Sequence, residues 1–393
     1  MLNDIGKVAQ DTIDAINEKI KNLNTLNIIV AGKTGVGKST LINAVFKDEL
    51  AETGMGRPVT THMRKISKKD IPLAIYDTKG FELGKDVQED VKKEIFDTIS
   101  NGLSSNDIND AIHCIWYCIN TTSNRIEPEE IEWLRELSKE NKKTQIPIIV
   151  VLTQTISKKN AEEMKQLILD ENLDIIQVIP VLAKDYEIEG LGTLESFGLD
   201  KLIEVMGQAL PEELMDTLQH VQIASLSEKK RRASKIVATA ALAATGQGAA
   251  PIPFADAALL IPTQVGMIAS ITAIFGIDVN KTVIRTLLSS TLGSGGATIL
   301  GRSVVANILK LVPAAGTMAG GAISAATAGV ITAALGSAYT TIMEMVYKGE
   351  MDIGDISSEK GKKTLSKIFN DKLKSGKDNL NSYLDILSDD KKS

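Results

Sequence analysis

Near the N-terminus of this 393-residue chain, an apolar run leads directly into a glycine-rich loop. The run LNIIVA is followed by GKTGVGKST, which matches the pattern G-x-x-x-x-G-K-[S/T] in strand, loop and helix order. In such a loop the glycines let backbone amides turn toward phosphate oxygens, and the following helix presents its positive end to the same anion. We therefore predict that Lys38 reaches the β- and γ-phosphates of a nucleotide and that the Ser39 hydroxyl is a ligand of Mg²⁺. The predicted phosphate site consists of Gly32, Lys33, Thr34, Gly35, Val36, Gly37, Lys38, Ser39 and Thr40.

The next apolar runs predict the architecture around this loop. IPLAIYD, AIHCIWYCI, IPIIVV and IIQVIPV are short, apolar at nearly every position and separated by helical stretches. Strands that are apolar on both faces belong to a parallel sheet covered by helices. We predict an α/β fold, a P-loop domain with a mostly parallel sheet, over residues 25–208.

The remainder of the chain has a different composition. A length of 393 residues exceeds what one hydrophobic core usually supports. Residues 236–343 contain only six charged side chains and are rich in Ala, Gly, Ser, Thr, Ile, Leu and Val. We predict a second, all-α domain over residues 209–356, followed by an amphipathic helix and a frayed tail over residues 357–393. Apolar residues at three- and four-residue steps in residues 1–24 predict another amphipathic helix, which packs on the helical domain.

Charge and cysteine content exclude some partners. The net charge is −6, with 44 basic against 50 acidic residues, and aromatic residues make up 4% of the chain. This composition has neither the excess of basic residues nor the aromatic residues typical of nucleic-acid-binding proteins, so we expect no nucleic-acid partner. Cys114 and Cys118 lie in an apolar run, which favours buried thiols in a reducing cytoplasm over a metal site. The N-terminal residues include acids and no continuous apolar stretch, so we expect no secretory leader and a cytoplasmic location.

A segment downstream of the loop resembles the first switch of Era-like GTPases. Residues 54–61 read GMGRPVTT, and in that family a threonine after Pro-Val covers the metal ion. The resemblance implies that Thr60 is a metal ligand and part of the catalytic machinery, with Thr61 as the alternative.

The strand IPLAIYD ends in a second motif of the same family. The sequence Asp77-Thr78-Lys79-Gly80 is similar to D-T-P-G, with Lys79 in place of the proline. The resemblance implies that Asp77 holds Mg²⁺ through water and that the Gly80 amide contacts the γ-phosphate. Together the motifs imply a protein that binds GTP or GDP and hydrolyses GTP with Mg²⁺.

The segments that would read the base match less closely. Where the family has N-K-x-D or T-K-x-D, this chain has LTQTI, so Thr153 and Gln154 align and Ile156 replaces the aspartate. That aspartate normally reads the guanine N1–H and exocyclic amine, so its replacement leaves the choice of base open. The sequence VLAK is similar to the S-A-K loop, which implies that Ala183 and Lys184 contact the base.

The residue after Gly80 bears on hydrolysis. GTPases that orient the attacking water with glutamine carry it there, and this chain has Phe81. Another group must then supply positive charge in the transition state. We hypothesise slow hydrolysis that is accelerated when two copies associate through their G domains; the competing hypothesis is a nucleotide-binding scaffold with negligible hydrolysis. The candidate cations are Lys33, Arg57, His62 and Arg64.

The alanine- and glycine-rich half shows a second resemblance. Residues 241–277 are similar to the helical domain of unknown function that follows Era-like G domains in a family of bacterial proteins, and the combination is distantly similar to immunity-related and dynamin-like GTPases. Residues 236–255, 257–277 and 311–343 carry no charge and are long enough to span a bilayer, although prolines interrupt them. We favour a closed soluble bundle. The alternatives are permanent spanning and reversible association with the inner face of a membrane, for which the basic run at 229–232 would meet anionic lipid.

Overall fold

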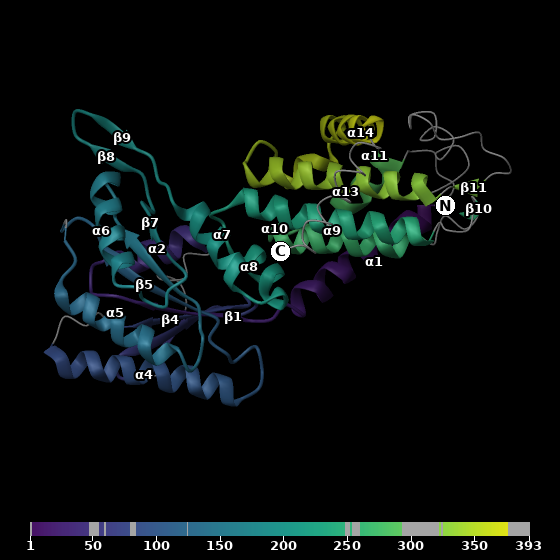
Figure 1. Ribbon diagram of the computed structural model, residues 1–393. Coiled ribbons are helices and arrows are strands. Elements are labelled where there is room, and N and C mark those ends of the chain that lie inside the picture. The colour runs from purple at the N-terminus through teal and green to yellow at the C-terminus, as the bar shows by residue number, and fades with distance from the viewer. Residues whose placement is uncertain are drawn as a thin grey trace. The chain divides into compact units, whose positions relative to one another are not determined.

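The computed structural model describes residues 2–46, 55–58, 60–78, 84–123, 125–247, 252–253, 260–292, 322–323 and 325–375. It divides the chain into two compact units (Figure 1). Residues 23–228 form the first unit, and the described parts of residues 1–22 and 229–393 form the second.

A seven-stranded sheet with strand order β2-β3-β4-β1-β5-β6-β7 lies at the centre of the first unit. Five strands run parallel, and β2 and β3 are antiparallel to their neighbours at one edge. The predicted α/β fold with a mostly parallel sheet is confirmed. The strands are β1 (Leu26–Ala31), β2 (Met55–Pro58), β3 (Met63–Ser67), β4 (Leu73–Thr78), β5 (Cys114–Asn120), β6 (Ile148–Thr153) and β7 (Gln177–Pro180).

Helices cover both faces of this sheet (Figure 1). Alternate residues of β1 enter two separate cores, because successive side chains of a strand point to opposite faces. One core includes side chains of α2, α7 and α8, and the other includes side chains of α4, α5 and α6. The helices are α2 (Lys38–Val45), α4 (Gly84–Ser104), α5 (Pro128–Asn141), α6 (Lys158–Asp170), α7 (Leu199–Ala209) and α8 (Met215–Val221).

Both cysteines belong to the buried strand β5. Cys114 and Cys118 are free and fully buried, and burial raises the pKa of each thiol to about 12. Neither thiol belongs to a cluster of metal-ligating side chains among the described residues.

The first unit extends beyond the predicted domain boundary at 208–209. Leu218 and Val221 of α8 are buried in the core beside α2, and Ile223 donates its backbone N–H to the Val45 carbonyl at 2.7 Å. The composition already shifts at this point of the chain, but the apolar face of α8 packs on the sheet domain. The division therefore falls between Glu228 and Lys229.

The second unit consists mainly of helices in its described parts (Figure 1). The N-terminal helix α1 packs on α10 and α11, and α14 packs on α11 and α13. Two residues each from β10 (Ile252–Pro253) and β11 (Ala322–Ile323) pair antiparallel. The helices are α1 (Leu2–Lys21), α9 (Leu226–Gln247), α10 (Ile261–Phe275), α11 (Lys281–Leu292), α13 (Ala325–Tyr347) and α14 (Glu359–Lys374).

Small residues let these helices approach closely. A Cβ atom added at Gly336 of α13 would lie 2.6 Å from Val237 of α9 and 2.7 Å from the Met267 sulfur of α10. Among the described helices, Ala328–Tyr347 alone is long and apolar enough to cross a membrane, and 72% of that window is buried inside the structure. The apolar composition of this helix therefore serves packing within the unit.

The basic run at 229–232 does not form one exposed surface. Lys229 is only 1% exposed, and its ammonium donates a hydrogen bond of 2.8 Å to the Ile274 carbonyl near the end of α10. It also lies 5.7 Å from the ring centroid of Tyr347. Lys230 forms an ion pair of 2.9 Å with Glu344. The suggestion that Lys229 meets lipid head groups is therefore wrong for this packed state, because a helix terminus already binds its charge.

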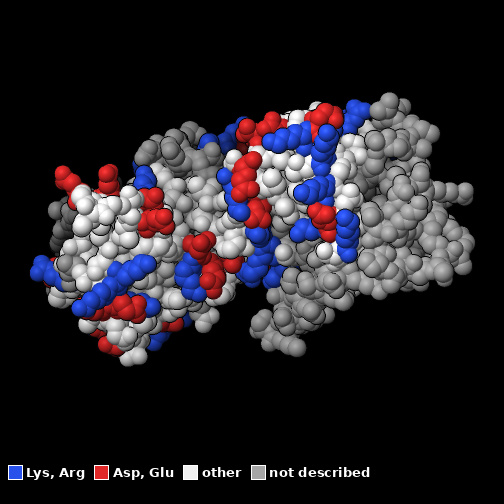
Figure 2. Space-filling model, turned by 90° about the horizontal axis from the view of Figure 1, so that it is seen from above, with Lys and Arg blue, Asp and Glu red and all other residues white. Residues whose placement is uncertain are grey.

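Charged side chains of both signs are interspersed over the described surface that Figure 2 shows. No single-sign field dominates the described part of that face. This agrees with the nearly balanced composition of 44 basic and 50 acidic residues.

Candidate functional site

The glycine-rich loop joins β1 to α2 at the carboxyl end of the central strand. Gly32 packs so closely on β5 that a Cβ atom there would lie 2.5 Å from the Cys118 carbonyl oxygen. Gly37 has a φ of 96° at the N-cap of α2, a conformation that side chains disfavour. These two positions require glycine, so the loop shape follows directly from the sequence motif.

Lys38 is held inside this loop. Its side chain is buried, and its ammonium donates hydrogen bonds to the Gly32 carbonyl at 2.8 Å and the Lys33 carbonyl at 3.0 Å. Ser39 and Thr40 are exposed at the start of α2. Positive charge and a helix N-terminus therefore meet at one point, the arrangement that binds phosphate.

Thr153 and Gln154 contact the loop itself. The Thr153 hydroxyl lies within hydrogen-bond distance of the Val36 carbonyl, and the Gln154 side-chain amide donates to the Gly35 carbonyl at 3.0 Å. The resemblance places this pair in the motif that contacts the nucleotide. In the structure both side chains form hydrogen bonds with the phosphate loop from the end of β6.

A cleft of about 240 Å³ opens next to the loop. It lies between α2, the end of β6 and the segment after β7, so the two segments predicted to contact the base lie together beside the phosphate loop. Ile156 forms part of its apolar wall. The cleft is lined by Gly37, Thr40, Leu41, Thr153, Gln154, Ile156, Val181, Leu182, Ala183, Lys184, Asp185 and Tyr186.

Asp77 lies at the end of β4, beside β1. Its Oδ1 is buried and accepts no hydrogen bond from a described residue, while Oδ2 is 3.6 Å from the Arg64 guanidinium. Burial raises the pKa of Asp77, and the charges of Lys38 and Arg64 act in the opposite direction. A buried carboxylate oxygen without such a partner fits the oxygen ligands that Mg²⁺ takes.

Thr60 and His62 are held by a residue that the sequence did not reveal. The Thr60 hydroxyl donates to the carboxylate of Glu94 on α4. The same carboxylate accepts the His62 backbone N–H and lies 3.1 Å from His62 Nδ1. Thr61, the alternative ligand, is exposed. Glu94 lies mid-helix and far from any motif, so only the fold could identify it.

Of the other predicted site residues, some lie outside the part of the chain that the structure describes. Gly80 and its neighbours Lys79 and Phe81 lie outside the described residues, and so does the side chain of Arg57. The Lys33 ammonium is 3.5 Å from Glu130, which lies in the first turn of α5.

Comparison with known families agrees with this geometry. Residues 27–154 match the 50S ribosome-binding GTPase family. The first unit is a P-loop GTPase domain. Residues 214–375 match a domain of unknown function, DUF697, so the GTPase domain is followed by a DUF697 helical domain. The resemblance predicted from the motifs is confirmed at this level.

Septins are among the curated relatives. Neuronal-specific septin-3 of Mus musculus is 24% identical over 214 residues, which cover 48% of this chain and 60% of that protein. Septin-4 of Homo sapiens is 28% identical over 176 residues, covering 39% of this chain and 36% of that protein. The chain thus spans less than two thirds of the length of these relatives.

Two solved structures show a distant likeness. A GDP-bound mutant of NFeoB from S. thermophilus has a TM-score of 0.31 and 12% identity, covering 88% of this chain and 98% of that one. A dimerization-deficient mutant of Toc33 from Arabidopsis thaliana has a TM-score of 0.29 and 14% identity, covering 55% of this chain and 94% of that one. These scores are low, so the assignment rests on the family match and on the site.

Proposed function

We propose that this chain binds GTP with Mg²⁺ at the P-loop, hydrolyses it to GDP and phosphate, and acts as a nucleotide switch for its helical unit. One observation carries the proposal: the phosphate loop, the Asp77 carboxylate and the cleft all lie at the carboxyl ends of parallel strands. In open α/β sheets this is where ligands bind.

Each residue then has a defined task. Lys38 exchanges the Gly32 and Lys33 carbonyls for phosphate oxygens, and Gly80 donates its amide to the γ-phosphate. Ser39, Thr60 and Asp77 would hold Mg²⁺, which would supply positive charge beside the phosphates. Gln154 and Thr153 keep the loop in shape, while Ala183 and Lys184 face the base.

Hydrolysis by an isolated copy should be slow. Phe81 offers no group that orients water. Arg64 pairs with Asp77, and Lys33 faces Glu130, so both cations already have partners within this chain. A second copy that supplies a cation across the nucleotide would therefore accelerate the reaction.

The helical unit is proposed to act in its closed form. Burial of Lys229 and of most of Ala328–Tyr347 supports a packed unit over a membrane-spanning one. Association with a lipid surface would require this packing to open.

Calorimetry with GTP, GDP and ATP in the presence of Mg²⁺, followed by phosphate release on the same samples, tests the function. We expect guanine nucleotides to bind preferentially and the turnover per molecule to rise with protein concentration. Constant turnover over a wide concentration range contradicts the self-association. Binding without multiple turnovers supports the nucleotide-binding scaffold in its place.

The contact between Thr60 and Glu94 gives a more specific prediction. If Thr60 moves from Glu94 to the metal on loading, Glu94→Ala removes a contact made only before binding. We expect Mg²⁺·GTP to bind roughly three- to tenfold more tightly, since a hydrogen bond to a charged group is worth about 1.5–3 kcal/mol and part of it is replaced by water. Glu89→Ala, an exposed change on the same helix, is the matched control. Equal affinity in both variants would show that Thr60 stays on Glu94.

A further inference from the structure

The cleft beside the phosphate loop needs a group that reads the base. Guanine presents two adjacent donors, N1–H and the exocyclic amine, and a site discriminates strongly only when its own polar groups pair with them. Ile156 stands where a carboxylate would accept both, and its side chain cannot accept a hydrogen bond. Guanine binding therefore requires an acceptor from another part of the cleft.

Asp185 is the carboxylate that the described lining of the cleft provides. It follows Ala183 and Lys184 directly, in the loop that leaves β7. The next residue, Tyr186, also lines the cleft and begins the short hairpin of β8 (Tyr186–Ile188) and β9 (Gly192–Leu194). An acceptor and an aromatic ring are thus presented from adjacent positions.

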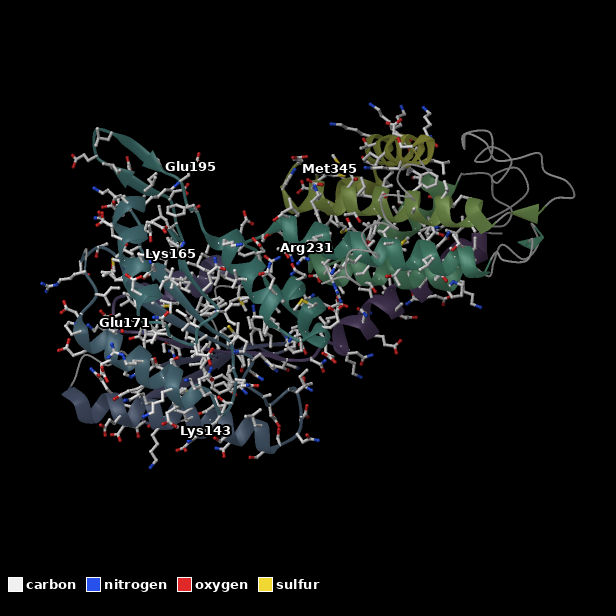
Figure 3. The ribbon with its side chains drawn as sticks, in the orientation of Figure 1. Lys143, Lys165, Glu171, Glu195, Arg231 and Met345 are labelled. Atoms are coloured by element: carbon white, nitrogen blue, oxygen red, sulfur yellow. The ribbon has the colours of Figure 1, made fainter. Side chains whose placement is uncertain are left out.

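The structure holds the Asp185 side chain in place. Its Oδ1 accepts the Ser196 backbone N–H at 2.7 Å, and this hydrogen bond lowers the pKa of the carboxyl. Two further backbone hydrogen bonds of 3.0 Å join Leu182 to Phe197 and close the base of the hairpin. Glu195, labelled in Figure 3, lies between the end of β9 and Ser196. The Ser196 side chain also hydrogen-bonds the Asp185 carboxylate and lowers its pKa further.

We infer that Asp185 is the residue that selects guanine in this chain, accepting from the N1–H and the exocyclic amine in place of the aspartate that Ile156 replaces. The inference rests on the proposed GTP binding and names the residue behind its specificity. Adenine is disfavoured by the same group because its N1 is an acceptor, which faces a carboxylate unfavourably.

Because Ser196 holds the Asp185 side chain, the role of Asp185 can be tested by a substitution that keeps this hydrogen bond. In Asp185→Asn the amide oxygen can keep the hydrogen bond to Ser196, while an NH₂ group replaces the other oxygen. Xanthine carries a carbonyl where guanine carries the amine, so an amide matches xanthine and a carboxylate matches guanine. We expect Asp185→Asn to lose about tenfold or more in affinity for GDP and to gain affinity for xanthosine diphosphate, since charged hydrogen bonds are worth about 1.5–3 kcal/mol and 1.4 kcal/mol is about tenfold.

Controls separate this inference from the function on which it rests. Glu187→Gln removes the same charge from the neighbouring hairpin strand without touching the cleft, and it should leave the ratio of the two affinities unchanged. Asp185→Ala should weaken GDP binding with no gain for the xanthine nucleotide. Because each ratio is measured on one protein sample, partial loss of folded protein does not alter it.

Two results contradict the inference in different ways. A wild-type chain that prefers guanine, together with an unchanged ratio in Asp185→Asn, overturns the role of Asp185 and leaves GTP binding intact. A wild-type chain that binds ATP as well as GTP overturns the guanine specificity itself.

Discussion

Lys38→Ala is expected to abolish nucleotide binding at ordinary concentrations. The ammonium is the buried positive charge of the phosphate loop, held 2.8 and 3.0 Å from two loop carbonyls. Losing its contacts to two phosphates should weaken binding roughly 100-fold or more, since each charged hydrogen bond is worth about 1.5–3 kcal/mol. Calorimetry with GDP and GTP at matched protein concentration measures the loss.

Substitution of a lysine outside the phosphate loop is the control for the loss of one positive charge in Lys38→Ala. Lys143 follows α5, its side chain is 81% exposed, and it pairs only weakly with Glu140 at 3.4 Å (Figure 3). Lys143→Ala should bind nucleotide as the unaltered chain does. Retention of GDP affinity within about threefold in Lys38→Ala would place the phosphate site elsewhere, because a P-loop lysine contributes more than that margin.

Lys229→Ala is expected to destabilise the helical unit by about 3–5 kcal/mol. The substitution removes a side chain that is 1% exposed, leaves a cavity, and deprives the Ile274 carbonyl of its donor. Lys229→Met loses the charge and the donor but keeps most of the volume, so it leaves a smaller cavity and should cost less. The neighbouring Lys230 is 46% exposed in its ion pair with Glu344, and Lys230→Ala should cost at most about 1 kcal/mol.

Denaturation monitored with two probes assigns the effect to the correct unit. Both tryptophans of the chain, Trp116 and Trp133, are buried in the sheet domain, so their fluorescence follows that domain alone. Far-ultraviolet circular dichroism also follows the helices of the second unit. Lys229→Ala should lower the midpoint of the circular dichroism transition and leave the tryptophan transition in place. An unchanged dichroism midpoint would mean that the Lys229 ammonium contributes nothing to the packing.

Local signals explain why the phosphate site could be predicted. Gly37 is required by its positive φ, which is a property of one short segment. Gly32 belongs to the same motif, although the contact that requires it, with the Cys118 carbonyl of β5, is long-range. Asp77 follows from a strand and a motif in the correct order behind that loop. A motif can be recognised without knowledge of distant contacts, so the sheet, the loop and the ends of its strands were all predictable.

Contacts between distant segments explain what could not be predicted. Gln154 lies 119 positions from its partner Gly35, and Glu94 lies 34 positions from Thr60. Neither hydrogen-bonded pair is part of a sequence motif or a periodic pattern from which it could be predicted. The same reason accounts for α8, whose apolar residues predict burial without saying which core receives them. The β8–β9 hairpin, short and polar, gave no strand pattern at all.

By itself the sequence determined an α/β P-loop domain, its phosphate-binding residues and a helical partner domain, because these depend on short-range pattern and on glycine conformation. Tertiary structure alone decided that Lys229 caps a helix inside the second unit, that Glu94 holds Thr60, and that Asp185 enters the cleft where Ile156 offers no acceptor. The physical reason is that burial and hydrogen-bond partners are properties of the packed chain, and a charged residue in a sequence looks the same whether folding exposes it or encloses it.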